Sequence, residues 1–432
     1  MDKLVIHGGR PLKGRVQING AKNAVLPILA AALLADDIVI IENIPKIADI
    51  DNMVEIVRSL KVNVEYLDEH TLRVDSRGMV NSCADSEAVR NMRASYYLLG
   101  VLLGRFKYAQ VSFPGGCDFG VRPIDQHIKG FEALGAEVDA KSIIEIKARE
   151  LRGTNIFLDV VSVGATINIM LAAVLAKGTT VIENAAKEPH VVDTASFLNS
   201  MGADIKGAGT DVIRIRGVQK LHGSTYAVIP DQIEAGTYMV AAAITGGDVT
   251  VENLIPRHME AITAKLRESG VKVYEKGDSL RVISEGIRKK PVKIKTLPYP
   301  GFPTDMQPQM MAYLATIPGT SIVNESVYEG HRFKYVEQLK RMGANIDVES
   351  HIAIVDGVAE LVGTDVEATD LRAGAAMVLA GLAAVGDTVV TNIKYIDRGY
   401  ERMVDKFNSM GANIERVHEK TPIPIRPRQQ AG

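Results

Sequence analysis

The residue best suited to reactive chemistry is Cys117, which lies in the glycine-rich stretch SFPGGCDFGVRP at residues 112–123. Glycine and proline disfavour both helix and strand in this stretch, so the pattern predicts a flexible loop that solvent reaches. Arg122, five residues further on, would favour the thiolate form of the cysteine. The loop by itself is equally compatible with a reactive thiol and with an incidental cysteine on a hairpin.

Charged residues also recur at the start of six apolar, alanine-rich segments. Lys22, Arg93 and Arg372 stand at three of these starts, and Asp231 and Asp305 stand at two others. A helix N-terminus exposes unpaired N–H groups and about half a positive charge, so such ends suit anions. If the six ends meet at one cleft, that cleft is electropositive with a few embedded carboxylates. Helix capping is the alternative role, and sequence alone favours capping for both aspartates.

A unit repeated six times must position these residues. A small-residue turn leading into a short strand recurs about every 70 residues, and its six copies are SLKVNVEY, ALGAEVD, SMGADIK, ESGVKVY, RMGANIDV and SMGANIERV. In step with it run six helices that are apolar nearly all round, while segments such as DNMVEIVRSL are amphipathic and belong on a surface. Six buried helices are too many for one core, so the pattern predicts two domains of about 200 residues with three units each.

Composition restricts the class of protein. The chain has 432 residues, 46% of them hydrophobic and 24% charged, and a formal net charge of −2. No global positive field therefore attracts nucleic acid or an anionic membrane, and neither partner is expected. The N-terminus lacks a secretory signal, and the longest apolar stretch, 373–385, is too short to span a bilayer. Two cysteines are too few for a disulfide framework or a cysteine metal site, so we expect a reducing cytoplasm and no metal.

Seven motifs occur in order and at characteristic spacing over residues 1–417. They are GAKNA at 20–24, RNMRAS at 90–95, PGGCDFGVRP at 114–123, SVGATIN at 162–168, FPTDMQ at 302–307, ATDLRA at 368–373 and IDRGYER at 396–402. Each motif is weak alone, but together they resemble the bacterial UDP-N-acetylglucosamine 1-carboxyvinyltransferases, or UDP-N-acetylglucosamine enolpyruvyl transferases, of the enolpyruvyl transferase family.

The resemblance implies a fold. It is an α/β fold of two domains, an inside-out α/β prism built from six βαβαββ repeats, three per domain. The implied N-terminal domain is 22–229 and carries the Cys117 loop, whereas the C-terminal domain is discontinuous and comprises 1–21 and 230–417. Residues 418–432 lie beyond the repeats, are proline-rich and polar, and are expected to be a disordered tail.

The resemblance also implies a reaction. The enolpyruvyl group of phosphoenolpyruvate passes to the 3′-hydroxyl of UDP-N-acetylglucosamine and phosphate is released, which is the first committed step of peptidoglycan synthesis; no cofactor takes part. Cys117 matches the proton donor, which also forms a covalent adduct with phosphoenolpyruvate and is alkylated by the epoxide fosfomycin. Asp305 matches the base that takes the hydroxyl proton. Lys22 and Arg398 match the groups that act on the phosphate.

The resemblance assigns binding residues as well. Those for phosphoenolpyruvate are Lys22, Asn23, Arg122, Arg332, Arg372 and Arg398. Those for UDP-N-acetylglucosamine are Asn23, Arg93, Arg122, Pro123, Ile124, Asp125, Gln126, Val161, Ser162, Val163, Gly164, Asp305 and Val327. Arginine forks suit the oxyanions of both substrates, and a helix opening with Ser-Val-Gly suits a diphosphate.

Three positions depart from the family's pattern, because Ala48, Val160 and Gln232 stand where lysine, lysine and arginine occur in other members. Two alternatives stay open. One is a 5-enolpyruvylshikimate-3-phosphate synthase, which shares the fold but lacks the PGGC loop. The other is a catalytically silent paralogue that only binds a nucleotide sugar. The presence of Lys22, Cys117, Asp305 and Arg398 argues against the silent paralogue.

Overall fold

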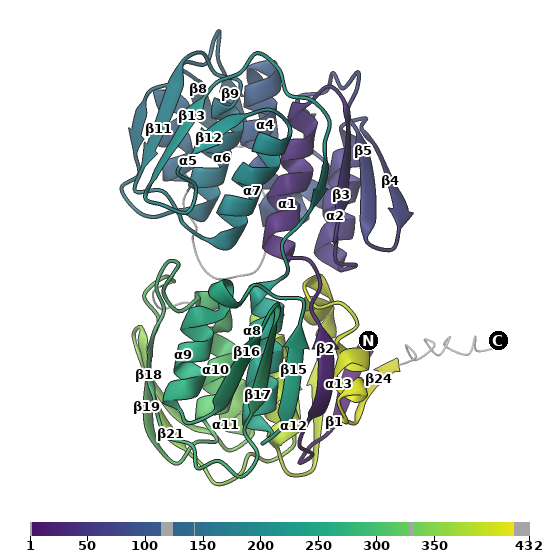
Figure 1. Ribbon diagram of the computed structural model, residues 1–432, viewed down its shortest axis with the longest axis vertical. Helices are drawn as coiled ribbons and strands as arrows, with labels where there is room; N and C mark the ends of the chain where they lie inside the picture. Colours follow the sequence, from purple (N-terminus) through teal and green to yellow (C-terminus); the bar gives the residue numbers. More distant parts are fainter. Residues whose placement is uncertain (1, 114–123, 142, 329–331, 419–432) are drawn as a thin grey trace, which may run out of the picture.

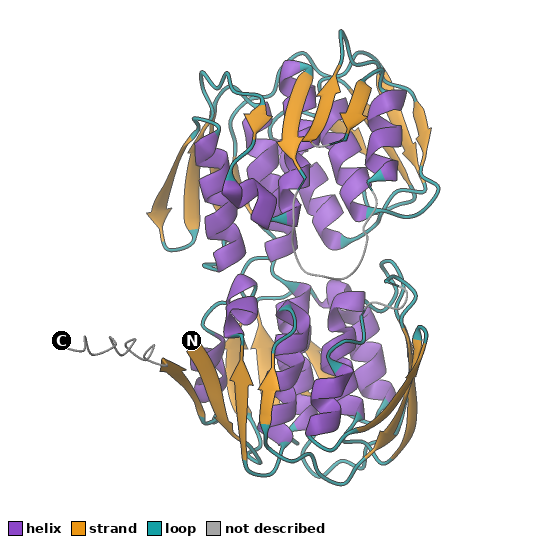
Figure 2. Cartoon of the chain, turned by 180° about the vertical axis from the view of Figure 1, so that it is seen from behind, coloured by secondary structure: helices purple, strands orange, loops and turns teal. Residues whose placement is uncertain are grey.

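The structure, a computed structural model, describes residues 2–113, 124–141, 143–328 and 332–418. The chain forms two halves that lie one above the other along the longest axis (Figure 1). In Figure 2 the helices fill the middle of each half and the strands flank them. This arrangement confirms the predicted two-domain α/β fold with buried helices.

Each half contains three four-stranded sheets, and all six sheets share one topology. The first two strands of each order below are parallel, and the remaining neighbours are antiparallel. The upper sheets have the orders β14 (Thr225–Ala227), β3 (Ile38–Glu42), β5 (Thr71–Asp75), β4 (Asn63–Asp68); β6 (Cys83–Ala84), β7 (Tyr108–Ser112), β9 (Ile143–Lys147), β8 (Glu137–Ala140); and β10 (Asn155–Phe157), β11 (Thr179–Glu183), β13 (Val212–Arg216), β12 (Asp204–Lys206).

The lower half repeats this pattern with strands from both ends of the chain. Its orders are β2 (Lys13–Gln17), β15 (Asp248–Glu252), β17 (Ser279–Ile283), β16 (Lys272–Lys276); β18 (Lys293–Lys295), β19 (Gly319–Asn324), β21 (Ile352–Gly357), β20 (Asn345–Glu349); and β22 (Asp365–Glu367), β23 (Asp387–Thr391), β1 (Asp2–His7), β24 (Ile414–His418). The strands β1 and β2 thus complete lower sheets, while β14 returns to complete an upper one.

Three inner helices lie in each half. They are α1 (Lys22–Ala31), α4 (Tyr97–Phe106) and α6 (Val163–Ala173) above, and α8 (Gln232–Ile244), α10 (Gln307–Leu314) and α12 (Leu371–Ala383) below. Small residues let these helices approach closely, since a Cβ added at Gly100 of α4 would lie 2.3 Å from the Asn168 carbonyl oxygen of α6. Burial on most sides explains why their sequences are apolar nearly all round.

The remaining helices are shorter or more amphipathic. They are α2 (Ala48–Ser59), α3 (Glu87–Asn91), α5 (Asp125–Ala133), α7 (Pro189–Ser200), α9 (Glu260–Glu268), α11 (Val336–Arg341) and α13 (Met403–Ser409), with 3₁₀ turns η1 (Ala32–Leu34), η2 (Arg93–Tyr96), η3 (Pro256–Met259), η4 (Thr304–Met306) and η5 (Ile393–Arg398). No helix in the described part of the chain combines the length and the apolar character that a membrane crossing requires.

The buried side chains form two separate cores. One runs from Ala21 to Val228, and the other combines residues 4–18 with residues 233–414. These cores support the predicted domain limits of 22–229 against 1–21 with 230–417, which stay a prediction. The expected tail began at residue 418, but His418 ends β24 and pairs with Asp2, with 2.7 Å between Nδ1 and Oδ1. Residues 419–432 lie outside the described residues.

Candidate active site

Two stretches of chain, one at Gly20 and one at Pro230, pass side by side between the halves and position α1, the first inner helix. Gly20 and Pro230 form an antiparallel bridge, and the Ala21 N–H donates to the Ile229 carbonyl at 2.7 Å. A Cβ at Gly20 would lie 1.7 Å from the Asn43 carbonyl oxygen, so only glycine fits. The crossing therefore sets the position of Lys22, the first residue of α1.

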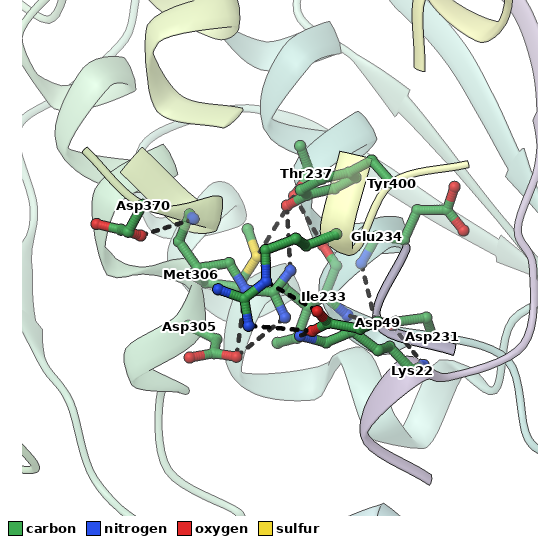
Figure 3. Close-up of polar contacts among 12 residues, drawn as sticks. Lys22, Asp49, Asp231, Ile233, Glu234, Thr237, Asp305, Met306, Asp370 and Tyr400 are labelled. Carbon is green, nitrogen blue, oxygen red and sulfur yellow. Dashed lines mark hydrogen bonds and ion pairs between the residues drawn. The ribbon is translucent and has the colours of Figure 1, made fainter. Parts of the chain in front are cut away.

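Asp49 joins Lys22 to Arg398. Lys22 Nζ lies 3.1 Å from Asp49 Oδ2, and Arg398 Nε lies 2.8 Å from Asp49 Oδ1. Arg398 comes from η5 of the lower half, so the carboxylate links the two halves (Figure 3 shows Lys22 and Asp49). The Asp49 side chain is 4% exposed. Its burial raises the pKa, but the charges of Lys22 and Arg398 outweigh that effect and lower it.

Asp305, in η4 just before α10, pairs with two arginines of the lower half. Arg332 donates from Nη2 to Oδ1 at 2.9 Å, and Arg372 donates from Nε and Nη2 to Oδ2 at 3.2 and 3.0 Å. The side chain of Asp305 is 29% exposed, whereas those of the arginines are 3% and 5% exposed. Burial raises the pKa of Asp305, but Arg372, Arg332 and Lys22 together hold it well below its usual range. Because the charge of Lys22 acts on Asp305, the cluster around Asp49 lies next to the cluster around Asp305.

The capping interpretation is confirmed for Asp231 and wrong for Asp305. Asp231 accepts from Ile233 N at 2.7 Å and Glu234 N at 3.1 Å at the start of α8, and from Lys22 N at 3.2 Å at the start of α1. An anion thus lies where two helix N-termini converge (Figure 3). Asp305 caps neither η4 nor α10, because its oxygens are held by arginine side chains instead.

Asp370 and Tyr400 fix the position of Arg372. Asp370 caps α12 by accepting from the Arg372 N–H at 2.8 Å. Tyr400 accepts from Arg372 Nη1 at 3.4 Å, and its hydroxyl also lies 2.9 Å from Thr237 Oγ1. Figure 3 shows this network between α8, α12 and the segment after η5. Arg372 is therefore held at its backbone N–H by Asp370 and at its guanidinium group by Tyr400.

Asn23 lines a small cavity between the halves, together with His190, Asp231, Gln232 and His258. Burial lowers the pKa of His190, although the charges of Glu188, Asp305 and Asp231 oppose that shift. His190 therefore shares this cavity with Asp231.

A second group of predicted residues lies around α5 and the start of α6. Gln126 is buried, donates to Asp125 Oδ2 at 2.8 Å and Asp159 Oδ2 at 3.1 Å, and accepts from the Asp159 N–H at 2.9 Å. Arg93 lies over the Tyr96 ring, 5.4 Å from its centroid. Ile124 is the residue immediately before α5. Gln126 is thus held by the protein itself, whereas Asp125 is exposed.

Ser162 caps α6 by accepting from the Ala165 N–H at 3.3 Å, and Val163 and Gly164 form the first turn. A Cβ at Gly164 would lie 2.9 Å from Nε2 of His127, so the helix start approaches α5 closely. Val160 and Val161, just before this turn, are 59% and 38% exposed. The helix end is accordingly open to a ligand on the side of the two valines.

Tyr328 connects the two groups. Its ring lies 5.4 Å from the Arg332 guanidinium carbon. The pKa of Tyr97 is raised by burial and then by the charge of Tyr328, while Arg93 opposes the shift. Val327, next to Tyr328, is 36% exposed. Tyr97 thus senses the charges of both Tyr328 and Arg93. Cys117, Arg122 and Pro123 lie outside the described residues.

The sequence did not single out Asp49, Tyr400 or His190. Tyr400 does lie within the motif IDRGYER, so the sequence marked its segment but not the residue itself. Asp49 carried only a weak signal, an acidic residue in the first turn of an amphipathic segment. His190 follows Pro189 at a helix start and has no motif around it.

Comparison with known proteins gives consistent results. A family model described as EPSP synthase (3-phosphoshikimate 1-carboxyvinyltransferase) matches residues 6–407. A Clostridium botulinum protein named UDP-N-acetylglucosamine 1-carboxyvinyltransferase is 59% identical and covers 96% of this chain and 100% of its own length. A Clostridium acetobutylicum protein named UDP-N-acetylglucosamine 1-carboxyvinyltransferase 2 is also 59% identical, with coverage of 96% and 99%.

Solved structures resemble the fold. The enolpyruvyl transferase NikO from Streptomyces tendae has a TM-score of 0.86 at 27% identity, covering 96% of this chain and 99% of its own. An EPSP synthase from Acinetobacter baumannii has a TM-score of 0.75 at 20% identity, with coverage of 97% and 100%. The EPSP synthase likeness concerns the fold alone.

Proposed function

Because the chain belongs to the family described as EPSP synthase (3-phosphoshikimate 1-carboxyvinyltransferase), we propose that it transfers the enolpyruvyl group of phosphoenolpyruvate to the 3′-hydroxyl of UDP-N-acetylglucosamine. The choice of acceptor follows the two relatives that are 59% identical over nearly the whole chain. The proposal places the reaction in peptidoglycan synthesis and in the cytoplasm, with these two small molecules as the only substrates.

One observation carries the proposal. The carboxylate of Asp305 lies among Arg332 and two cations at the starts of inner helices, Lys22 and Arg372, and Arg398 adjoins them through Asp49. A phosphate and a carboxylate on one small substrate need this density of cations. A carboxylate that accepts a proton from a hydroxyl must lie beside them.

The chemistry assigns a task to each end of the site. A proton added to the methylene carbon of phosphoenolpyruvate leaves an oxocarbenium-like carbon, which the sugar oxygen attacks as it gives up its own proton. The group that donated the first proton then takes a proton back from the new methyl group as phosphate leaves, which restores the double bond. We assign the first proton to Cys117, which also forms the covalent adduct, and acceptance of the hydroxyl proton to Asp305.

The low pKa of Asp305 indicates that phosphoenolpyruvate binds before Asp305 acts as a base. A carboxylate whose pKa is held far below neutral is a weak base, so Arg332 and Arg372 must loosen their hold before it accepts a proton efficiently. The carboxylate of phosphoenolpyruvate competes for the same two guanidinium groups. Binding of that substrate therefore raises the pKa of Asp305 and prepares the base.

The remaining assignments follow the same logic. Lys22, Asn23, Arg122 and Arg398 bind the phosphate side of phosphoenolpyruvate. The uridine side of the nucleotide sugar contacts Arg93, Arg122, Pro123, Ile124, Asp125 and Gln126, its diphosphate contacts Val161, Ser162, Val163 and Gly164, and its sugar contacts Asn23, Asp305 and Val327. The exposed start of α6 supports the diphosphate assignment.

Phosphate release tests the proposal. The purified protein is mixed with phosphoenolpyruvate and either UDP-N-acetylglucosamine or shikimate 3-phosphate. We expect phosphate only with the nucleotide sugar. Release with shikimate 3-phosphate alone would assign the EPSP synthase reaction instead, and tight binding of UDP-N-acetylglucosamine without release would identify a silent paralogue.

A further inference from the structure

Three side chains with metal-binding atoms, none of them among the proposed substrate residues, meet at the junction of the halves. Glu69 and His70 form the turn between β4 and β5 of the upper half, and Glu401 follows η5 of the lower half. One ligand atom from each lies within 4.8 Å of the other two. No sequence pattern indicated this group, because His70 and Glu401 stand 331 positions apart in the chain.

His70 presents one ring nitrogen with its lone pair free. Its Nδ1 lies 2.8 Å from the Ile44 carbonyl oxygen, and a carbonyl only accepts, so Nδ1 carries the hydrogen. The other ring nitrogen, Nε2, faces Glu401 Oε1 at 3.8 Å, which is too long for a hydrogen bond. A histidine that donates one N–H to a backbone carbonyl and points the other nitrogen at a carboxylate has the arrangement of a metal ligand.

Glu401 is anchored in a similar way. Its Oε2 accepts from the Lys46 N–H at 2.9 Å and from the side-chain amide of Asn19, which leaves Oε1 towards His70. The side chain is 6% exposed, so this oxygen is held in a fixed place. Two donors that bind one zinc ion at about 2.1 Å lie about 3 to 4 Å apart. The separation between His70 and Glu401 falls in that range, and a carboxylate oxygen of the exposed Glu69 lies within 4.8 Å of both ligand atoms.

The local charge also favours a cation. Arg402, a positive group, follows Glu401 directly in the chain. Its Nε donates to Asp405 Oδ2 at 2.9 Å, so Asp405 already balances its charge. Two carboxylates and one imidazole remain. Oxygen and nitrogen ligands without sulfur suit divalent ions such as Zn²⁺ and Co²⁺.

We propose that Glu69, His70 and Glu401 bind one divalent transition-metal ion of the Zn²⁺ and Co²⁺ class, which links the two halves. Water completes the coordination. Because Glu401 lies three residues after Arg398, the ion holds the segment that carries Arg398 against the upper half. None of the three ligands is among the proposed substrate-binding residues.

Cobalt spectroscopy tests the site directly. Full-length protein is freed of metal with a chelator and titrated with Co²⁺, and the visible d–d absorption is followed. We expect one Co²⁺ per chain with no thiolate-to-cobalt charge-transfer band, which excludes Cys83 and Cys117 as ligands. The variants H70A and E69Q should bind Co²⁺ at least about tenfold more weakly.

The control is H351A, because His351 occupies the equivalent turn between β20 and β21 and belongs to no such group among the described residues. This variant should titrate like the wild type. E69Q alters only an exposed side chain, so its result stands even if H70A fails to fold. The proposal is overturned if the wild-type protein shows no d–d band, if the band includes thiolate charge transfer, or if E69Q binds Co²⁺ as tightly as the wild type.

Discussion

Replacing Asp305 by asparagine separates its chemical role from its structural one. The change keeps the shape of the side chain but removes the charge that Arg332 and Arg372 share. A positioned general base contributes a factor of about 10² to 10⁴ to the rate, and this corresponds to about 2.7 to 5.5 kcal/mol of barrier. We therefore expect kcat to fall by at least about 100-fold, while binding of UDP-N-acetylglucosamine stays within a few-fold, since a proton acceptor acts mainly in the transition state.

The same change has a cost in stability. Removing one partner of a fully buried ion pair costs about 3 to 5 kcal/mol. The side chain of Asp305 is 29% exposed, so solvent screens part of this loss and we expect about 1 to 3 kcal/mol. For a domain of about 200 residues this is a decrease of several degrees in Tm. Phosphate release, calorimetric titration with the nucleotide sugar and a thermal melt measure the three quantities.

A matched control is available at Asp248. This carboxylate accepts from Arg281 Nε and Nη2 at 2.8 and 2.6 Å and is 26% exposed, but it lies in β15, away from the site. Asp248→Asn should lower Tm slightly and leave kcat unchanged. If Asp305→Asn also keeps a normal kcat and only melts earlier, Asp305 is a structural ion-pair partner and the assignment of the base is refuted.

Three further predictions follow from individual residues. Cys117→Ser should remove most turnover, because a hydroxyl is a far weaker acid and nucleophile than a thiol, and fosfomycin should add its mass to the Cys117 peptide and not to Cys83, whose pKa is raised by burial. Burial raises the pKa of Asp193 to about 6 despite its bond from Tyr226, so the folded state binds the proton more tightly and loses up to about 3 kcal/mol of stability as pH rises from about 4 to 6. Asp193→Asn should abolish this loss, as calorimetric melts across that pH range would show. Val160→Lys places a cation beside the start of α6 and should tighten UDP-N-acetylglucosamine binding about two- to fivefold in calorimetric titration.

Each of these has an outcome that contradicts it. Full turnover in Cys117→Ser, or fosfomycin on Cys83, would remove Cys117 from the reaction. Parallel pH profiles of Tm for Asp193→Asn and the wild type would show that this carboxyl has an ordinary pKa. Val362, which is 56% exposed in the lower half, provides the control for an added charge. If Val160→Lys and Val362→Lys bind UDP-N-acetylglucosamine equally well, its diphosphate lies away from α6.

Much of the fold could be predicted because the local order of apolar and polar residues identifies the helices and strands of each repeat. Helices that are apolar on all sides must be buried whatever encloses them, so their number and the need for two cores followed from the sequence. The exchange of strands at the ends of the chain did not follow from periodicity. The strand β14 pairs with β3 across more than 180 residues, and such pairings leave no mark on either strand alone.

The site divides in the same way. Lys22, Arg372 and Ser162 were predicted at helix starts because capping and helix polarity act within a few residues of the chain. The partners of the charged groups were not predictable, since Asp49 meets Arg398 across 349 residues and Asp305 bonds to arginines rather than to the helix it precedes. The sequence by itself determined which groups stand at the helix ends, because those interactions are local. Only the tertiary structure decided which charges neutralise one another, because ion pairing depends on distance in space and the crossing at Gly20 brings the two halves together.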